Sequence, residues 1–307
     1  MNIAATIFHS RHACPLCHSV QIGDFLRLDN IRIAKCATCD FMFARDILAP
    51  EAIDHFYVDG YHDQRHMNGQ QVNAGISLEL LRSLRIDLKG KSVLDVGSGY
   101  GFLLDKLRDN GARRTVGIEL SRAQRSYATD KLRLEVLQQL DALSSTDRFD
   151  VITLFEVIEH IPAPYEFMQA ICERLKPGGS LIVGTDNFTS DVVTVLGGGF
   201  PKWIPHEHVS FFTPDTLKAM LLRCDRLTFS AARSFTPWEL LLRKLVFQAT
   251  AGRKGAKTYS YQAESAADGD RGYRFFSLRL AANRSWFRLT NSSDPRGEMM
   301  YLHMVKA

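Results

Sequence analysis

The sequence lacks any apolar run long enough to cross a lipid bilayer. Its longest runs, such as DVVTVL and WELLLRKLVF, fall well short of the roughly 20 residues that a membrane-spanning helix needs. The first residues also lack a basic start followed by a sustained apolar core, so we expect no secretory signal peptide. These absences predict a cytoplasmic protein.

A strong charge bias, internal repeats and low-complexity segments are also missing. The formal net charge is +4 on 307 residues, and the basic residues are scattered along the chain. A charge of this size permits nucleic-acid binding without indicating it. With 45% hydrophobic residues, the chain can bury a full core as one large domain or as two of unequal size.

Four of the six cysteines form two Cys-x-x-Cys pairs near the start of the chain, namely Cys14, Cys17, Cys36 and Cys39. This spacing is typical of a zinc ribbon, in which each pair lies on a tight turn. Four thiolates can close a tetrahedron around zinc with no open position, which makes the site structural rather than catalytic. A redox-active pair is the alternative, although no thioredoxin-like βαβ unit surrounds it. We expect the ribbon to occupy residues 1–50, followed by a connector and a helix over residues 51–90.

From residue 92 onward, short β-branched runs alternate with helical stretches. Such alternation predicts βαβ crossovers and a doubly wound parallel sheet, so residues 91–307 are expected to form an α/β domain. A flap is expected at about 188–212, where three glycines and a tryptophan follow a strand. An insertion at about 236–297 interrupts the alternation.

The segment VLDVGSGYGFLLDKL predicts a strand, a glycine turn and a helix, the layout by which open parallel sheets bind ligands beyond the carboxyl ends of their strands. Gly97, Gly99 and Gly101 form G-x-G-x-G, whereas a dinucleotide site usually has G-x-G-x-x-G. Glu119 ends the second strand, where a carboxylate can accept hydrogen bonds from both hydroxyls of a ribose. A ribose site without a pyrophosphate site suggests S-adenosylmethionine.

Residues 92–186 resemble the class I S-adenosylmethionine-dependent methyltransferases through VLDVGSGYG, GIELS, FDVITLFEVIEHI and LKPGG, in that order. The resemblance implies a Rossmann-like, mostly parallel sheet of seven strands, with S-adenosylmethionine as the cofactor. It also implies a set of cofactor-binding residues: Asp95, Gly97, Ser98, Gly99, Gly101, Glu119, Leu120, Asp141, Phe155, Glu156 and His160. Within this set the glycines admit the methionine part, Asp95 braces the turn and Glu119 holds the ribose. A solvated loop residue is an equal alternative for Asp141, and a structural role is one for His160.

The ribbon and the chain up to about residue 230 are similar to a subgroup in which a zinc ribbon precedes the methyltransferase domain. That subgroup includes C-methyltransferases of nucleotide-linked keto sugars and enzymes of polysaccharide and secondary-metabolite pathways. The resemblance implies methyl transfer to carbon or oxygen of a small polar acceptor, a sugar or a nucleotide- or lipid-linked sugar. A zinc-ribbon RNA methyltransferase is the alternative, but those enzymes usually have a histidine ligand and a differently spaced second pair.

A carbon or hydroxyl acceptor must lose a proton, so we expect a general base near the flap. His206 and His208 lie at the end of the flap, and a histidine suits this work near neutral pH. In the resembling sugar enzymes a histidine before a Phe-Thr pair occupies this place, and His208 matches it best. Tyr61 in the connector is a further candidate. The alternative for His208 is that it packs under the flap and bonds a backbone carbonyl.

Residues 237–257 combine leucines with arginines and lysines in a basic amphipathic stretch. Such a stretch permits peripheral contact with an anionic membrane. The alternative is a helix that packs over its own domain with its basic residues in water.

Asp186 and Asn187 follow a predicted strand, and an Asp-Asn pair in this place supplies magnesium ligands in catechol-type methyltransferases. Oxygen ligands suit magnesium. That site also needs an aspartate at the end of the preceding strand, where this chain has Phe155 and Glu156, so magnesium is not expected.

Overall fold

The computed structural model describes residues 8–28, 31–49, 64–204, 207–250 and 276–307. Its centre is a seven-stranded sheet in the order β12-β13-β10-β9-β6-β7-β8. The strands are β6 (Ser92–Val96), β7 (Arg114–Ile118), β8 (Glu135–Leu137), β9 (Phe149–Phe155), β10 (Leu175–Asp186), β12 (Leu227–Phe235) and β13 (Met299–Lys306). Strands β8, β7, β6, β9 and β10 are parallel, whereas β13 runs antiparallel to β10 and to β12. The predicted Rossmann-like α/β fold is confirmed.

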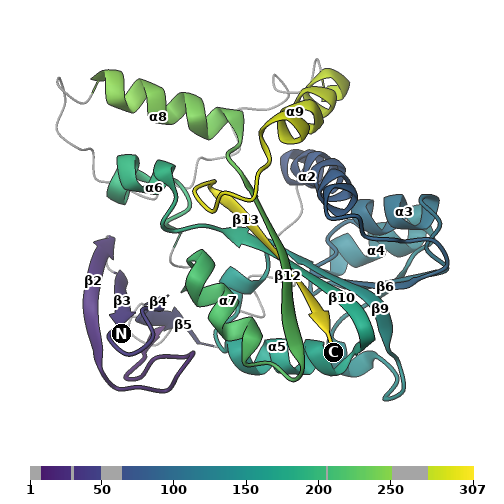
Figure 1. The fold of residues 1–307 in the computed structure, drawn as a ribbon, viewed down its shortest axis with the longest axis horizontal. Coiled ribbons are helices and arrows are strands. Elements are labelled where there is room, and N and C mark those ends of the chain that lie inside the picture. The colour runs from purple at the N-terminus through teal and green to yellow at the C-terminus, as the bar shows by residue number, and fades with distance from the viewer. Residues whose placement is uncertain (1–7, 29–30, 50–63, 205–206, 251–275) are drawn as a thin grey trace, which may run out of the picture.

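Helices cover both faces of this sheet, because the strands carry apolar side chains on both sides (Figure 1). The helices are α2 (Gln64–Ser83), α3 (Phe102–Asp109), α4 (Arg122–Leu132), α5 (Pro164–Glu173), α7 (Pro214–Leu222) and α9 (Phe276–Thr290). Val93 and Val151 share a cluster with side chains of α2, α3 and α9. Leu94 and Ile152, one residue further along each strand, pack with α5 and α7 on the opposite face.

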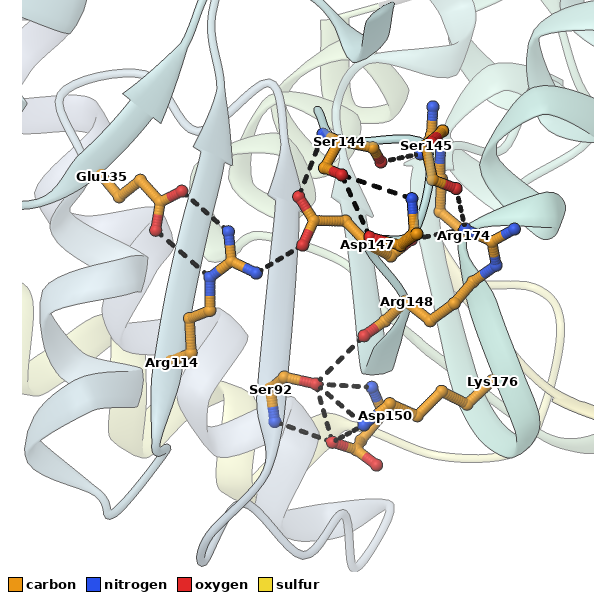
Figure 2. Close-up of polar contacts among 11 residues, drawn as sticks. Ser92, Arg114, Glu135, Ser144, Ser145, Asp147, Arg148, Asp150, Arg174 and Lys176 are labelled. Atoms are coloured by element: carbon orange, nitrogen blue, oxygen red, sulfur yellow. Dashed lines mark hydrogen bonds and ion pairs between the residues drawn. The ribbon is translucent and has the colours of Figure 1, made fainter. Parts of the chain in front are cut away.

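Polar contacts tie together the amino-terminal ends of the parallel strands (Figure 2). The carboxylate of Asp150 accepts hydrogen bonds from the N–H of Ser92 at 2.8 Å and from Nζ of Lys176 at 2.9 Å. Arg114 donates to Asp147 at 2.6 Å and also pairs with the first residue of β8. This edge of the sheet is therefore held by ion pairs, and the carboxyl edge is left for ligand binding.

The amino-terminal region forms two small sheets. Strand β1 (Phe8–Ser10) pairs with β5 (Asp46–Leu48), and β2 (Ile22–Leu28), β3 (Ile31–Cys36) and β4 (Met42–Ala44) form an antiparallel sheet. A fourth strand, β11 (Ser210–Phe211), completes the second sheet in the order β11-β4-β3-β2. Because β11 comes from the predicted flap, backbone pairing joins the end of that segment to the amino-terminal sheets, which are called the ribbon below.

The ribbon packs directly on the α/β domain. The rings of Phe41 and Phe212 have centroids 4.9 Å apart, and Cys14 belongs to the same apolar cluster as side chains of α7. Nη2 of Arg11, a buried side chain, donates to the carbonyl of Pro162 at 3.0 Å. The ribbon thus shares its core with the larger domain. The predicted boundary at residue 50 lies in a segment, residues 50–63, that is outside the described residues.

Four helices occupy the segments predicted as connector, flap and insertion. Helix α2 begins at Gln64, within the segment 51–90 predicted as connector and helix. The flap contains α6 (Asp191–Leu196), and the insertion contains α8 (Trp238–Thr250) and α9. Glu79 of α2 binds Arg284 and Arg288 of α9 at 2.6 and 2.7 Å, so this part of the insertion is fixed to the domain. Among the described helices, none is both long and apolar enough to span a membrane.

Candidate active site

The turn between β6 and α3 requires glycine for steric reasons. Gly97 and Gly101 have φ angles of 74° and 81°, in the left-handed region where L side chains are strained. A Cβ on Gly97 would lie 2.2 Å from Cγ2 of Val157, and a Cβ on Gly101 would lie 2.7 Å from Cδ1 of Leu134. The turn therefore leaves bare backbone at the carboxyl edge of the sheet, where a ligand can contact it.

Glu119 follows β7 and reaches the glycine turn. Its Oε2 accepts a hydrogen bond from the N–H of Gly99 at 2.8 Å, and its Oε1 accepts one from the N–H of Ser121 at 2.8 Å. Burial raises the pKa of this carboxyl, and the two backbone donors act in the opposite direction. The structure thus brings the predicted ribose-binding carboxylate together with the predicted methionine-binding turn.

Asp95 lies near the end of β6, beneath the same turn, and is buried. Oγ1 of Thr153 on β9 donates to Oδ1 of Asp95 at 2.6 Å. Burial raises the pKa of Asp95 to about 7, the hydrogen bond from Thr153 opposes this, and the charge of Glu119 adds to it. Asp95 is thus held rigidly under the turn by its neighbouring strand.

Helix α2 covers the glycine turn, a contact that sequence reasoning missed. Oε1 of Gln70 accepts a hydrogen bond from the N–H of Tyr100 at 2.9 Å, and its Nε2 donates to Oε1 of Gln124 at 2.8 Å. Nδ2 of Asn73 donates to Oε2 of Glu156 at 2.7 Å. The segment is predicted as a connector because many of its residues are polar. A helix that covers a polar site has the same polar composition as an exposed loop, so composition alone does not distinguish the two.

A single cavity of about 1650 Å³ joins the predicted cofactor residues to the end of the flap. Nine of the eleven predicted cofactor residues line it: Asp95, Gly97, Ser98, Glu119, Leu120, Asp141, Phe155, Glu156 and His160. The candidate base His208 lines the same cavity, whereas Gly99 and Gly101 do not. His206 and Tyr61, the other two candidates for proton transfer, lie outside the described residues.

Buried charges surround the flap lysine Lys202 at the other end of this cavity. Nζ of Lys202 lies 3.4 Å from Oε1 of Glu156 and 3.4 Å from Oδ1 of Asp186. Burial lowers the pKa of Lys202, but these carboxylates outweigh it and the pKa is raised. Glu159 and Glu298 also line this end, and burial raises the pKa of Glu159 to about 8. Sequence reasoning missed Lys202 and Glu298, since neither belongs to a motif.

The two described histidines of the site face each other, with ring centroids 4.8 Å apart. Nδ1 of His160 donates to the carbonyl of Glu207 at 2.9 Å, and Nδ1 of His208 donates to the carbonyl of Lys202 at 3.1 Å. Burial lowers the pKa of His160 to about 4 and that of His208 well below its ordinary value. Both rings are therefore neutral at pH 7 with the lone pair on Nε2. The backbone bond of His208 agrees with its predicted structural alternative, and its lowered pKa disfavours protonation of Nε2 in the ligand-free protein.

Two groups of side chains have metal-ligand geometry within the described part of the chain. In the ribbon, Sγ of Cys14 lies 3.7 Å from Sγ of Cys39, and Sγ of Cys17 lies 3.5 Å from Sγ of Cys36. A tetrahedral zinc with Zn–S bonds of about 2.3 Å gives sulfur–sulfur edges of about 3.8 Å, so these residues fit zinc.

The second group consists of Glu159, His160 and His208, whose ligand atoms lie within 4.8 Å of one another. Oγ1 of Thr185 donates to Oε2 of Glu159 at 2.7 Å. The ammonium of Lys202 already acts on this carboxylate electrostatically, so a cation is present in the cluster without a metal.

Asn187 has a structural function rather than that of a magnesium ligand. Its Nδ2 donates to the carbonyls of Pro295 and Gly297 at 2.7 and 2.9 Å, and its Oδ1 accepts from the N–H of Thr189 at 2.9 Å. The amide thus links the loop after β10 to the turn that precedes β13.

Comparison with known proteins agrees with this site. A family profile described as a methyltransferase domain matches residues 67–225, which begin within α2 and end after α7. The structure of a complex between the Haloferax volcanii Trm112 methyltransferase activator and a methyltransferase is similar in fold. Its TM-score is 0.50 at 16% identity, and the match covers 82% of this chain and 96% of that one.

Curated relatives are similar over about half of the chain. A ubiquinone biosynthesis O-methyltransferase of Coxiella burnetii is 33% identical over 147 residues, which are 43% of this chain and 62% of that protein. An enzyme of the same name from Xanthomonas oryzae is 31% identical over 171 residues, which are 51% of this chain and 71% of that protein. The chain therefore spans less than two thirds of the length of the first of these relatives.

Proposed function

Because the chain belongs to the class I S-adenosylmethionine-dependent methyltransferase family, we propose that it transfers a methyl group from S-adenosylmethionine to a small polar acceptor. The observation that carries this proposal is the single cavity that joins the glycine turn and Glu119 to His208. A donor and an acceptor bound at its two ends would meet near Phe155 and Glu156. Alignment of this kind is the main task of an enzyme that catalyses a displacement.

The residues at the cofactor end fit S-adenosylmethionine. When bound, it supplies a methyl group on a positively charged sulfonium. The backbone of the glycine turn would contact the methionine part, and Glu119 would exchange its bond to the N–H of Gly99 for bonds to ribose hydroxyls. Helix α2, through Gln70, would exclude water from this end.

At the acceptor end, His208 would act as the general base. Nδ1 donates to the carbonyl of Lys202, so Nε2 carries the lone pair and can accept a proton from the acceptor. Oδ2 of Asp186 lies 3.5 Å from Nδ1 and would stabilise the imidazolium that results. His206 and Tyr61 are also proposed as candidates for this proton transfer. Both residues lie outside the described part of the chain.

The acceptor is proposed to be a sugar or a nucleotide- or lipid-linked sugar, as the resemblance of the ribbon region implies. Similarity to O-methyltransferases favours a hydroxyl acceptor over a carbon one. The four ribbon cysteines are proposed to bind zinc, whose function is to hold the ribbon fold against the flap.

Isothermal titration with S-adenosylhomocysteine tests the cofactor site. We expect micromolar binding that is lost in Glu119→Ala and retained in His208→Ala, because only Glu119 lies at the glycine turn. In the same proteins, methyl transfer from labelled S-adenosylmethionine to a panel of nucleotide sugars should be lost in both variants. Absence of binding to the unmutated protein would remove the basis of the proposal.

A further inference from the structure

Glu298 is a buried carboxyl that lines the cavity and that the proposed reaction does not use. It precedes β13, its side chain is fully buried, and it lines the same cavity as His208. Neither Oε1 nor Oε2 accepts a hydrogen bond from a described N–H or hydroxyl donor, and the polar group beside them is the carboxyl of Asp186. Since a buried carboxyl without partners is costly, a group of this kind in a cavity indicates a ligand that completes its bonding.

The fold holds Glu298 firmly in this position. Its N–H donates to Oγ1 of Thr236 at 3.2 Å, and its carbonyl accepts from the N–H of Asn187 at 2.6 Å. Asn187 also binds the carbonyl of Gly297, so the turn before Glu298 is closed on both sides. Met299, the next residue, pairs with Asp186 in the sheet, which brings the two carboxyls close together. The position of Glu298 is therefore built into the sheet.

The carboxyls around Glu298 outnumber the described cations. Four carboxyls (Glu156, Glu159, Asp186 and Glu298) surround one ammonium, that of Lys202. Burial and mutual repulsion raise the pKa values of Glu159, Asp186 and Glu298, so the ligand-free protein holds protons among them that a bound cation would displace. Lys202 contacts Glu156 and Asp186, and no described cation forms an ion pair with Glu298. An acceptor with a phosphate or carboxylate here would be repelled, whereas one with a positive charge would be complementary.

We infer that Glu298 anchors a protonated amino group of the methyl acceptor, so the acceptor is an aminated compound such as an amino sugar. This inference rests on the proposed function and names its substrate class. An ammonium group donates three hydrogen bonds and carries the charge that the cluster lacks. A hydroxyl would satisfy one lone pair of the carboxyl but would not stabilise its ionised form as an ammonium would.

Comparison of the affinities for two matched sugars tests the inference. The full-length protein, saturated with S-adenosylhomocysteine, is titrated with D-glucosamine below the pKa of its amino group and, separately, with D-glucose. Glucosamine should bind at least about tenfold more tightly, because a charge-assisted hydrogen bond to a buried carboxylate exceeds a neutral one by this amount. In Glu298→Gln the two sugars should bind about equally tightly, and Glu298→Asp should retain part of the preference for glucosamine.

Glu239→Gln is the matched control. Glu239 lines the same cavity but, unlike Glu298, already forms an ion pair, with Arg279 at 3.4 Å, so the same chemical change there should leave the preference for glucosamine intact. Equal binding of the two sugars, tighter binding of glucose, or no saturable binding of either overturns the inference. Binding of S-adenosylhomocysteine, measured first in every protein, separates these outcomes from failure of the proposed function.

Discussion

Ser210 of β11 pairs with Phe43 of β4, so the strand that follows His208 is the edge strand of the ribbon sheet. The carbonyl of Val209 accepts from the N–H of Ala44 at 3.0 Å, and the N–H of Val209 donates to the carbonyl of Glu159 at 2.8 Å. The residue next to His208 is thus bonded to the ribbon on one side and to the cavity wall on the other.

Loss of zinc should therefore impair methyl transfer more than cofactor binding. In Cys36→Ser, or after chelation, we expect methyl transfer to fall at least about tenfold, because structural zinc sites supply the folding free energy of small ribbons. The affinity for S-adenosylhomocysteine, measured by titration, should change far less, since the glycine turn lies between β6 and α3 of the larger domain.

Zinc content, measured by atomic absorption, should be about one ion per chain in the unmutated protein. Cys172→Ala is the matched control, because Cys172 is a buried thiol of α5 outside the ribbon, and it should keep its zinc. Full activity in zinc-free protein would contradict the coupling between ribbon and flap.

Gly97→Ala should destabilise the protein and abolish cofactor binding. The new Cβ would lie 2.2 Å from Val157, and the φ of 74° would be strained, which together cost about 2 to 4 kcal/mol. Adding Val157→Ala should recover the free energy of unfolding lost to the steric clash but not that lost to the strained φ, as measured by urea unfolding. Gly198→Ala, where no atom lies within 4 Å, should change stability by less than about 0.5 kcal/mol. If Gly97→Ala left stability and cofactor binding unchanged, the close approach of Gly97 to Val157 would be disproved.

Asp95→Asn should stabilise the ligand-free protein at neutral and higher pH. Burial raises the folded pKa of Asp95 to about 7, above its unfolded value, so stability falls as pH rises between the two values. Removing the charge should raise the free energy of unfolding on the order of 2 to 4 kcal/mol near pH 8, with no gain near pH 4. Urea unfolding across this range measures the difference. A gain in the free energy of unfolding that grew toward acid pH would contradict the upward direction of the Asp95 pKa shift.

Asp150→Asn should have the opposite pH dependence. Burial raises the pKa of Asp150, but Ser92 and Lys176 outweigh it and hold the folded pKa well below the unfolded value. The stabilisation is then present above the unfolded pKa and is lost as pH falls below it. We expect Asp150→Asn to be about 1 to 3 kcal/mol less stable at pH 7, with the gap closing toward pH 2.

Asp225→Asn is the control for this pair of charge variants. Its side chain is 74% exposed beside Arg226, so its removal should shift the free energy of unfolding by less than about 0.5 kcal/mol at any pH. If Asp225→Asn and Asp150→Asn behaved alike, the amino-terminal edge of the sheet would not depend on its ion pairs.

Features that depend on local spacing follow from the amino-acid sequence alone. Two Cys-x-x-Cys pairs predict a four-sulfur cluster, alternation of strands and helices predicts the doubly wound sheet, and the glycine pattern places a ligand site after β6. Glu119 was predictable because the ends of adjacent parallel strands lie at the same edge. Each of these inferences needs only a few residues and the rule that relates them.

Which distant residues meet at the carboxyl edge of the sheet depends on the tertiary fold. Gln70 covers the glycine turn because α2 packs across α3, and Glu298 lies beside Asp186 because antiparallel β13 is inserted between β10 and β12. Strand β11 joins the ribbon through a pairing with β4 more than 160 residues earlier. No local pattern specifies such contacts, since they follow from strand order and register, which the burial of the whole sheet determines.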